Sequence, residues 1–175
     1  MEPVDALGED GDGQGFSRWR RMKIRKAEPR DAEQIAAILK ELGWFHSANR
    51  VPMEELSARV EKTLEETRDE KQSLTLVAED EPGQVAAFIC AHRTAAIFLS
   101  GPELYISALY VRQDARGKGI GGALLEAMRE YAGQTGCARL MALNSSERDS
   151  SERRFFEKHG FVKRSKIENY ILRLT

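Results

Sequence analysis

The fold of this chain is decided by the stretch Ser107-Ala108-Leu109-Tyr110-Val111-Arg112-Gln113-Asp114-Ala115-Arg116-Gly117-Lys118-Gly119-Ile120-Gly121-Gly122-Ala123-Leu124-Leu125. In it an apolar strand runs through a glycine-dense turn into an apolar helix. Small residues in the turn leave successive backbone N–H groups uncovered where the predicted helix begins. The helix dipole adds partial positive charge at that end, so the turn is predicted to bind an anion, with phosphate favoured.

Three other interpretations of this turn compete with an anion site. Gly117-x-Gly119-x-x-Gly122 fits the dinucleotide fingerprint, but that motif needs an acidic residue about twenty positions on, and residues 138–143 contain none. A Walker loop needs Ser or Thr after its lysine, and Lys118 is followed by glycine. The third is a turn that only packs a helix on a strand.

The hexapeptide 116–121 resembles the (Gln/Arg)-x-x-Gly-x-(Gly/Ala) signature of the GNAT acetyltransferases. A Leu-Tyr-Val strand lies directly before it, and residues 155–161 resemble the closing helix and Gly-Phe turn of that family. The resemblance covers about residues 22–174. It implies an α/β fold with a central mixed, mostly antiparallel sheet of six to seven strands and helices on both faces. It also implies a V-shaped splay between the fourth and fifth strands.

Composition fits one domain with a short tail. Residues 1–21 form an acidic, Gly-rich tail and a linker, and residues 22–175 are predicted to form the acetyltransferase domain. A net charge of −1 and the lack of long basic or apolar runs predict neither nucleic-acid binding nor a membrane span. The two cysteines suggest no metal site or disulfide, and a cytoplasmic protein is expected.

Periodicity and turn residues predict the remaining elements. Strands are expected at 22–27, 74–79, 85–91, 104–111 and 137–143; helices are expected from 29 to 42, from 52, from 120 and from 149 to 159; and 161–166 with 169–174 are expected to form a final hairpin. The aromatic loop with Trp44 and His46 is expected either to contact the acceptor or to clasp two helices. The apolar loop at 97–99 either covers a pocket or forms a homodimer contact.

The resemblance implies acetyl-CoA as the acyl donor. The residues it assigns to cofactor binding are Leu109, Tyr110, Val111, Arg116, Gly117, Lys118, Gly119, Ile120, Gly121, Gly122, Asn144, Asp149 and Phe156. The main chain of residues 109–111 is expected to pair with the pantetheine arm, and one N–H near Leu109 to polarise the thioester carbonyl. Asp149 stands where many relatives carry a cofactor-contacting asparagine, and it also fits a helix cap.

The implied reaction is direct attack of a small-molecule or peptide amine on the thioester. Many relatives use a tyrosine as general acid where this chain has Phe156, and an acidic strand residue where it has Ser107 and Ala108. The candidate substitutes are Glu103 or His92 as base and Tyr110 or Tyr105 as acid, with a structural role open for each; Leu109 and Asn144 complete the predicted catalytic set. The alternative function is an acyl-CoA-binding sensor or assembly module without transferase activity.

Overall fold

A five-stranded sheet organises the part of the chain that the computed structural model describes, which is residues 22–43, 46–67, 72–145, 148–164 and 172. The strands follow one another across the sheet in the order β1 (Lys23–Lys26), β2 (Ser73–Glu81), β3 (Gln84–Thr94), β4 (Glu103–Val111) and β5 (Arg139–Ala142). The first four are antiparallel to their neighbours, and β5 runs parallel to β4.

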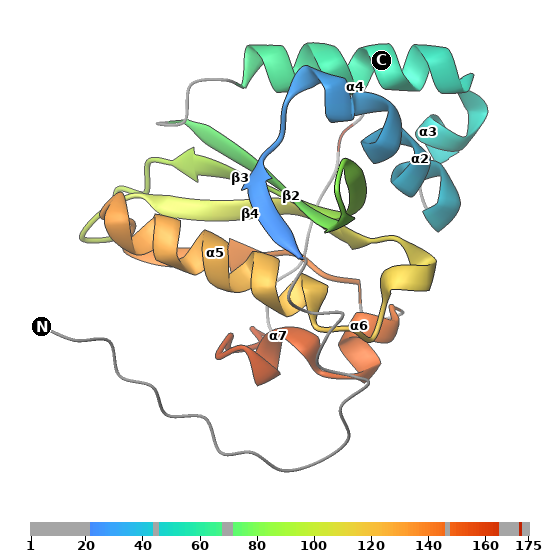
Figure 1. The fold of residues 1–175 in the computed structure, drawn as a ribbon. Helices are drawn as coiled ribbons and strands as arrows, with labels where there is room; N and C mark the ends of the chain where they lie inside the picture. Colours follow the sequence, from blue (N-terminus) through green and yellow to red (C-terminus); the bar gives the residue numbers. More distant parts are fainter. Residues whose placement is uncertain (1–21, 44–45, 68–71, 146–147, 165–171, 173–175) are drawn as a thin grey trace, which may run out of the picture.

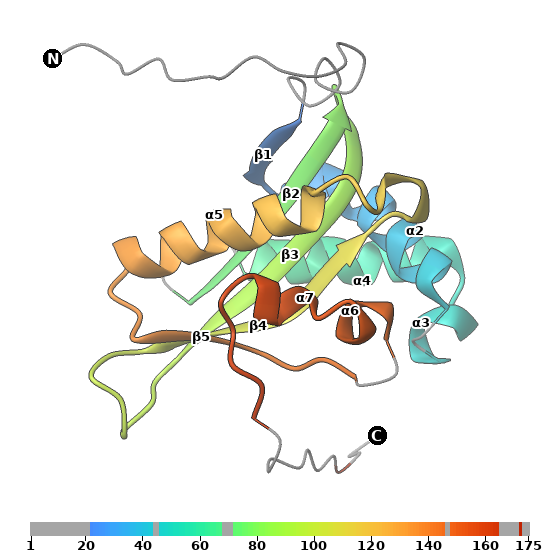
Figure 2. The same cartoon turned by 90° about the horizontal axis from the view of Figure 1, so that it is seen from below.

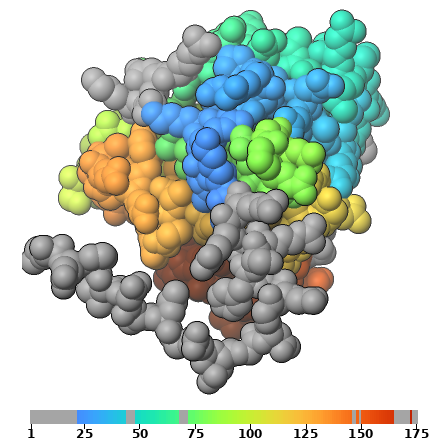
Figure 3. Space-filling view, in the orientation of Figure 1, coloured from blue at the N-terminus to red at the C-terminus, as the bar shows by residue number. Residues whose placement is uncertain are grey.

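Helices cover both faces of this sheet (Figures 1 and 2). They are α2 (Ala32–Leu42), α3 (His46–Arg50), α4 (Met53–Glu66), α5 (Ile120–Gln134), α6 (Asp149–Glu152) and α7 (Phe155–Lys158), with single 3₁₀ turns at η1 (Pro29–Asp31) and η2 (Gln113–Ala115). In the space-filling view, α2, α3 and α4 form the upper layer and α5 lies below (Figure 3). The predicted mixed sheet with two helical layers is confirmed.

Each strand sends alternate side chains to the two layers, because the side-chain period of a strand is two. On β2, Leu76 and Ala78 belong to the core shared with α5, whereas Val77 packs with residues of α2 and α4. Each covering helix has an apolar stripe that packs on the sheet. Ile35 and Ile38 of α2 pack on one face of the sheet, and Leu124 and Met128 of α5 pack on the other. The sheet is thus buried on both sides.

Three details of the predicted fold are wrong or lie outside the description. The described chain has five strands rather than six to seven. One arm of the expected final hairpin, 161–164, has no regular structure, and most of the other arm lies outside the described residues. The single last helix is two short ones, since Arg154 adopts a left-handed conformation with φ 51° between them.

A β-bulge in β4 changes which side chains meet which layer. Cys90 pairs with Ala108, but the next residue of β3, Ala91, pairs with Ile106, so Ser107 is the extra residue on β4. Before the bulge, Ile106 belongs to the core shared with α5; after it, Leu109 packs there and Tyr110 turns toward α2. Strict alternation along the sequence would have placed Ile106 and Tyr110 on the same face.

A buried charge cluster ties β1 to η1 and β2. The Arg25 guanidinium donates to both carboxylate oxygens of Asp31, each at 2.7 Å, and to Glu79 Oε1 at 2.7 Å. Burial is the largest single influence and opposes ionisation of each acid, but the hydrogen bonds and the positive charge of Arg25, together with a backbone N–H donor to each carboxylate, outweigh it and hold the pKa of Asp31 and of Glu79 below its usual range. We call these three residues the Arg25 cluster.

The Arg25 cluster predicts an acid-labile contribution to stability. Because the pKa of both carboxyls is lower in the folded chain, the unfolded chain takes up protons first as the pH falls below about 4. The contribution is therefore complete above about pH 5 and is lost as the pH falls through the folded pKa values. Urea unfolding across this pH range measures the effect. The free energy of unfolding should fall more steeply with falling pH in the unchanged protein than in Asp31→Asn. Equal slopes in the two proteins would contradict this contribution of the Arg25 cluster.

Candidate active site

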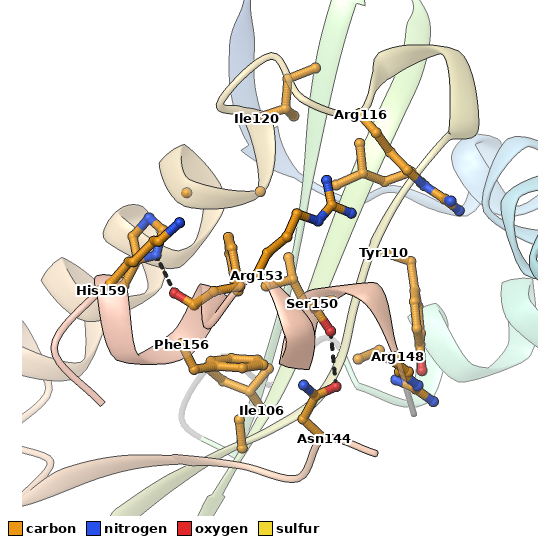
Figure 4. Close-up of a pocket in the computed structure, with 18 of the residues that line it drawn as sticks. Ile106, Tyr110, Arg116, Ile120, Asn144, Arg148, Ser150, Arg153, Phe156 and His159 are labelled. Atoms are coloured by element: carbon orange, nitrogen blue, oxygen red, sulfur yellow. Dashed lines mark hydrogen bonds between the residues drawn. The ribbon is translucent and has the colours of Figure 1, made fainter. Parts of the chain in front are cut away.

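A cavity of about 410 Å³ lies beside the C-terminal half of β4 (Figure 4). Its walls come from that half-strand, the turn into α5, the end of β5, and α6 with α7. The lining residues used below are Leu42, Ser107, Leu109, Tyr110, Val111, Arg116, Gly117, Gly119, Ile120, Gly121, Gly122, Asn144, Arg148, Ser150, Arg153, Phe155, Phe156, Lys158 and His159. Most of the residues predicted to bind the cofactor are thus brought to one cavity.

One wall of the cavity is a strand edge without a neighbouring strand in the described chain. Among these residues β5 pairs with β4 only from Glu103 to Ile106, although β4 continues to Val111. The N–H of Arg112 donates to the Ala86 carbonyl on β3 at 2.8 Å. Since main-chain groups of an antiparallel strand alternate in direction, Val111 and Leu109 direct theirs away from β3. Arg116 Nε donates to the Val111 carbonyl at 3.1 Å, which agrees with this direction.

The turn after β4 presents backbone donors at the start of α5. Gly117 and Gly119 have φ values of 74° and 76°, which glycine adopts without strain. Gly119 is the N-cap and brings no capping side chain, and the first intrahelical bond runs from Ala123 N–H to its carbonyl. The N–H groups of residues 120–122 therefore have no acceptor within the helix. This end of a 15-residue helix favours an anion.

Close packing of α5 on α7 fixes the far side of the turn. A Cβ on Gly122 would lie 2.7 Å from His159 Nε2, so only glycine fits without a shift. The His159 ring is held, because its Nδ1–H donates to the Phe155 carbonyl at 2.8 Å and the ring lies 4.6 Å from that of Phe155. His159, at the C-terminal end of α7, also lines the cavity.

This contact gives a stability prediction with an internal control. Gly122→Ala should lower the free energy of unfolding by about 1–3 kcal/mol, the usual cost of overpacking. Gly133→Ala, in the same helix with nothing within 4 Å of its added Cβ, should raise it by about 0.5–1 kcal/mol. Urea unfolding of the two variants tests this; a Gly122→Ala protein as stable as the unchanged one would contradict the close packing.

Three cationic side chains from the segment between β5 and Gly160 line the cavity. Arg153 extends across its middle, and the Arg148 guanidinium lies 5.8 Å from the centre of the Tyr110 ring (Figure 4). Lys158, in α7, also lines it. Sequence reasoning missed these three, because Arg148 and Arg153 lie in a bend and a turn outside α6 and because α7 has only four residues and carries no periodic signal. The only available signal was the concentration of basic residues over 148–158.

Several predicted site residues lie elsewhere or have other partners. Lys118 donates to the Asp114 carbonyl and does not line the cavity, and Glu103 is buried in an ion pair with Arg139, also outside it. Asn144 does line it, with Oδ1 accepting from Ser150 Oγ at 3.1 Å (Figure 4). Phe156 lines it without a hydroxyl. Trp44 and the side chains of His46 and Asp149 lie outside the described residues.

The described segments contain no group of three or more His, Cys, Asp or Glu side chains that could hold a metal ion. None of their helices combines the length and the apolar character needed to cross a membrane.

The chain is similar in sequence to proteins named as acetyltransferases. Residues 38–161 match the Acetyltransferase (GNAT) family. The chain is 32% identical to the uncharacterized N-acetyltransferase YhfO of Bacillus subtilis (strain 168), over 86% of this chain and 97% of that protein. It is 34% identical to the putative phosphinothricin acetyltransferase YwnH of the same organism, over 81% of this chain and 84% of that protein.

A solved structure shares the fold. It is that of AAC(6')-Iy in complex with the bisubstrate analog CoA-S-monomethyl-acetylneamine. The TM-score is 0.67 and the identity 20%, with 87% of this chain and 99% of that chain covered. The similarity extends over nearly the whole of the described region.

Proposed function

Because this chain belongs to the GNAT acetyltransferase family, and is thus an acyltransferase, we propose that it transfers the acetyl group of acetyl-CoA to a primary amine. Both substrates are held together in the cavity beside β4, and the amine attacks directly. One observation carries the proposal: the edge of β4 that has no neighbouring strand among the described residues and the uncapped start of α5 line the same cavity. A strand edge suits the amide groups of pantetheine, and a helix start suits a diphosphate.

The residues present fit acetyl-CoA. The N–H groups of residues 120–122 would hold the pyrophosphate. The outward main-chain groups of Leu109 and Val111 would pair with the pantetheine arm. Arg153 and Lys158 would add charge-assisted contacts to phosphate oxygens.

The protein has to assist only a few steps of the proposed transfer. Acetyl-CoA supplies its acetyl group as a thioester, and a thiol with a pKa of about 8.5 is a good leaving group. The Leu109 N–H is directed away from β3 into the part of the cavity beside the edge of β4, which we call the slot, and it would polarise the carbonyl that the amine attacks. Phe156 offers no proton at the place where many relatives of the resembled family carry a tyrosine. Holding the two reactants together supplies most of the acceleration.

The acceptor would enter from the side of the cavity formed by Leu42, Tyr110 and Arg148. An arginine stacked on an aromatic ring there would pair with an anionic group on the acceptor. The similarity to a protein named as a putative phosphinothricin acetyltransferase points to the same class, amino acids with a second acidic group. Such compounds therefore belong in any acceptor panel beside polyamines, aminoglycosides and peptide amines.

An acceptor screen with thiol detection tests the proposal. Acetyl-CoA is mixed with the protein and, in turn, phosphinothricin, glutamate, spermidine, kanamycin and an alanine-terminated peptide. Thiol release that depends on both protein and amine is the expected result. Phe156 in place of a tyrosine, and Ser107 and Ala108 in place of an acidic residue, favour one other function, an acyl-CoA-binding module. That function predicts a raised melting temperature with acetyl-CoA and no amine-dependent release.

The oligomeric state stays a prediction. Ile97 and Phe98 are exposed in the loop between β3 and β4, and the Arg139 guanidinium lies 5.4 Å from the centre of the Phe98 ring. Light scattering of the purified protein and of Phe98→Ser tests whether this loop joins two copies.

A further inference from the structure

A compact polar cluster lies at the bulge of β4, where the strand leaves β5. Ser107 Oγ is 2.9 Å from His92 Nε2 and 3.3 Å from the Cys90 carbonyl oxygen. Cys90 Sγ is 3.6 Å from the same histidine nitrogen. Ser107 lines the cavity and His92 does not, so the serine stands between the histidine and the cavity.

The cluster lies beside the place where the amine is proposed to attack the thioester. Ser107 is two residues before Leu109, whose N–H faces the slot, and both residues line the cavity. No Asp or Glu is found in the lining formed by the described chain. His159 also lines the cavity, but its Nε2 abuts Gly122 on the anion-binding side. The carboxylate of Glu103 is occupied by Arg139.

Resting on the acetyl transfer proposed above, we propose that Ser107 and His92 form a relay that takes the proton from the attacking amine. As the new C–N bond forms, the amine proton passes to Ser107 Oγ while the serine hydroxyl proton passes to His92 Nε2. The C–S bond breaks with its electron pair on sulfur, and CoA leaves as thiolate. The imidazolium then returns its proton to solvent, from which the thiolate takes one.

The relay requires one tautomer of His92. Nε2 must be unprotonated to accept from the Ser107 hydroxyl, so the neutral ring must carry its proton on Nδ1. The opposite tautomer would donate from Nε2 to Ser107 Oγ, and the serine would then donate to the Cys90 carbonyl. Both arrangements fit the observed distances, and they differ in the direction in which a proton can move.

Nitrogen NMR of the histidine side chains decides between them without any acceptor. Spectra of the full chain are recorded at about pH 9, and His92 is assigned from the signals lost in His92→Gln. His159 serves as an internal reference for the Nδ1–H form, since its Nδ1 donates to a carbonyl. The relay predicts that neutral His92 also carries its proton on Nδ1. In Ser107→Ala the Nε2 signal of His92 should change, because the hydrogen bond from the serine hydroxyl is lost. A proton on Nε2 of His92 overturns the proposal.

Kinetics on the best acceptor of the panel provide the second readout. Ser107→Ala and His92→Gln should each lower kcat about 100-fold, within the usual range for general base catalysis, with the acetyl-CoA-induced rise in melting temperature unchanged. Glutamine can still hydrogen-bond to Ser107, so a merely structural histidine would tolerate it. Ser107→Thr keeps the hydroxyl, so its kcat should stay within about threefold of that of the unchanged protein. Thr94→Ala, exposed on the same strand, is the control for β3 and should match the unchanged protein.

The outcomes separate this inference from the function on which it rests. If the unchanged protein releases no thiol with any amine, the proposed transfer fails. If it does release thiol and both Ser107→Ala and His92→Gln retain full kcat, only the relay fails. A loss of kcat in both variants, with the Nδ1–H form of His92, supports the relay.

Discussion

Gly121→Glu is expected to abolish the rise in melting temperature that acetyl-CoA produces in the unchanged protein. The new carboxylate would stand beside the N–H groups of residues 120–122, where the pyrophosphate is proposed to bind. Like charges brought together at a binding site cost several kcal/mol, which corresponds to at least about 100-fold in Kd. Ligand at 100 times Kd stabilises a protein by about 2.7 kcal/mol, or roughly 5–10 °C in a chain of this size. That shift should vanish.

Two substitutions at the same position separate charge from bulk. A Cβ on Gly121 would lie 3.5 Å from Val111 Cγ2 and 3.6 Å from Phe155 Cζ, which are ordinary contacts, so Gly121→Ala should fold and bind acetyl-CoA normally. The glutamine of Gly121→Gln has the shape of glutamate without its charge. This variant should bind acetyl-CoA at least about tenfold more tightly than Gly121→Glu does. A full thermal shift in Gly121→Glu would exclude the start of α5 as the pyrophosphate site.

Arg25→Met is expected to give the largest loss of stability of any single substitution considered. It would leave two carboxylates of the Arg25 cluster without a counter-charge, and their side chains are only 2% and 10% exposed. Removing one partner of a buried ion pair typically costs about 3–5 kcal/mol, because an uncompensated buried charge remains. Guanidinium unfolding at neutral pH measures the loss.

A matched substitution supplies the control. Arg59 pairs with Glu55 on the exposed side of α4, where both side chains are more than half exposed. Arg59→Met should therefore change the free energy of unfolding by no more than about 0.5 kcal/mol. Adding Asp31→Asn to Arg25→Met should recover part of the loss, since one unpaired charge is removed. A loss below about 1 kcal/mol for Arg25→Met would show that water compensates the two acids.

The local elements and the glycine turn were determined by the sequence alone. Period-two and period-3.6 patterns depend on neighbours along the chain, so β2, β3, α2 and α5 were predicted near their observed bounds. The turn from Arg116 to Gly122 could be predicted from sequence for the same reason. Glycines that allow positive φ and a helix start without a capping side chain are both local features. The short helices α6 and α7 offered no such pattern.

The direction of each side chain at the site was decided only by the tertiary structure. The bulge at Ser107 comes from the register between β3 and β4, and it sends the main-chain groups of Leu109 to the slot. The same register brings His92 within 2.9 Å of Ser107, fifteen residues away along the chain. Register is set by the sum of many contacts across the sheet, and a shift of one residue reverses every face. Local periodicity therefore predicts that these strands form, whereas only the folded sheet determines which of their residues meet.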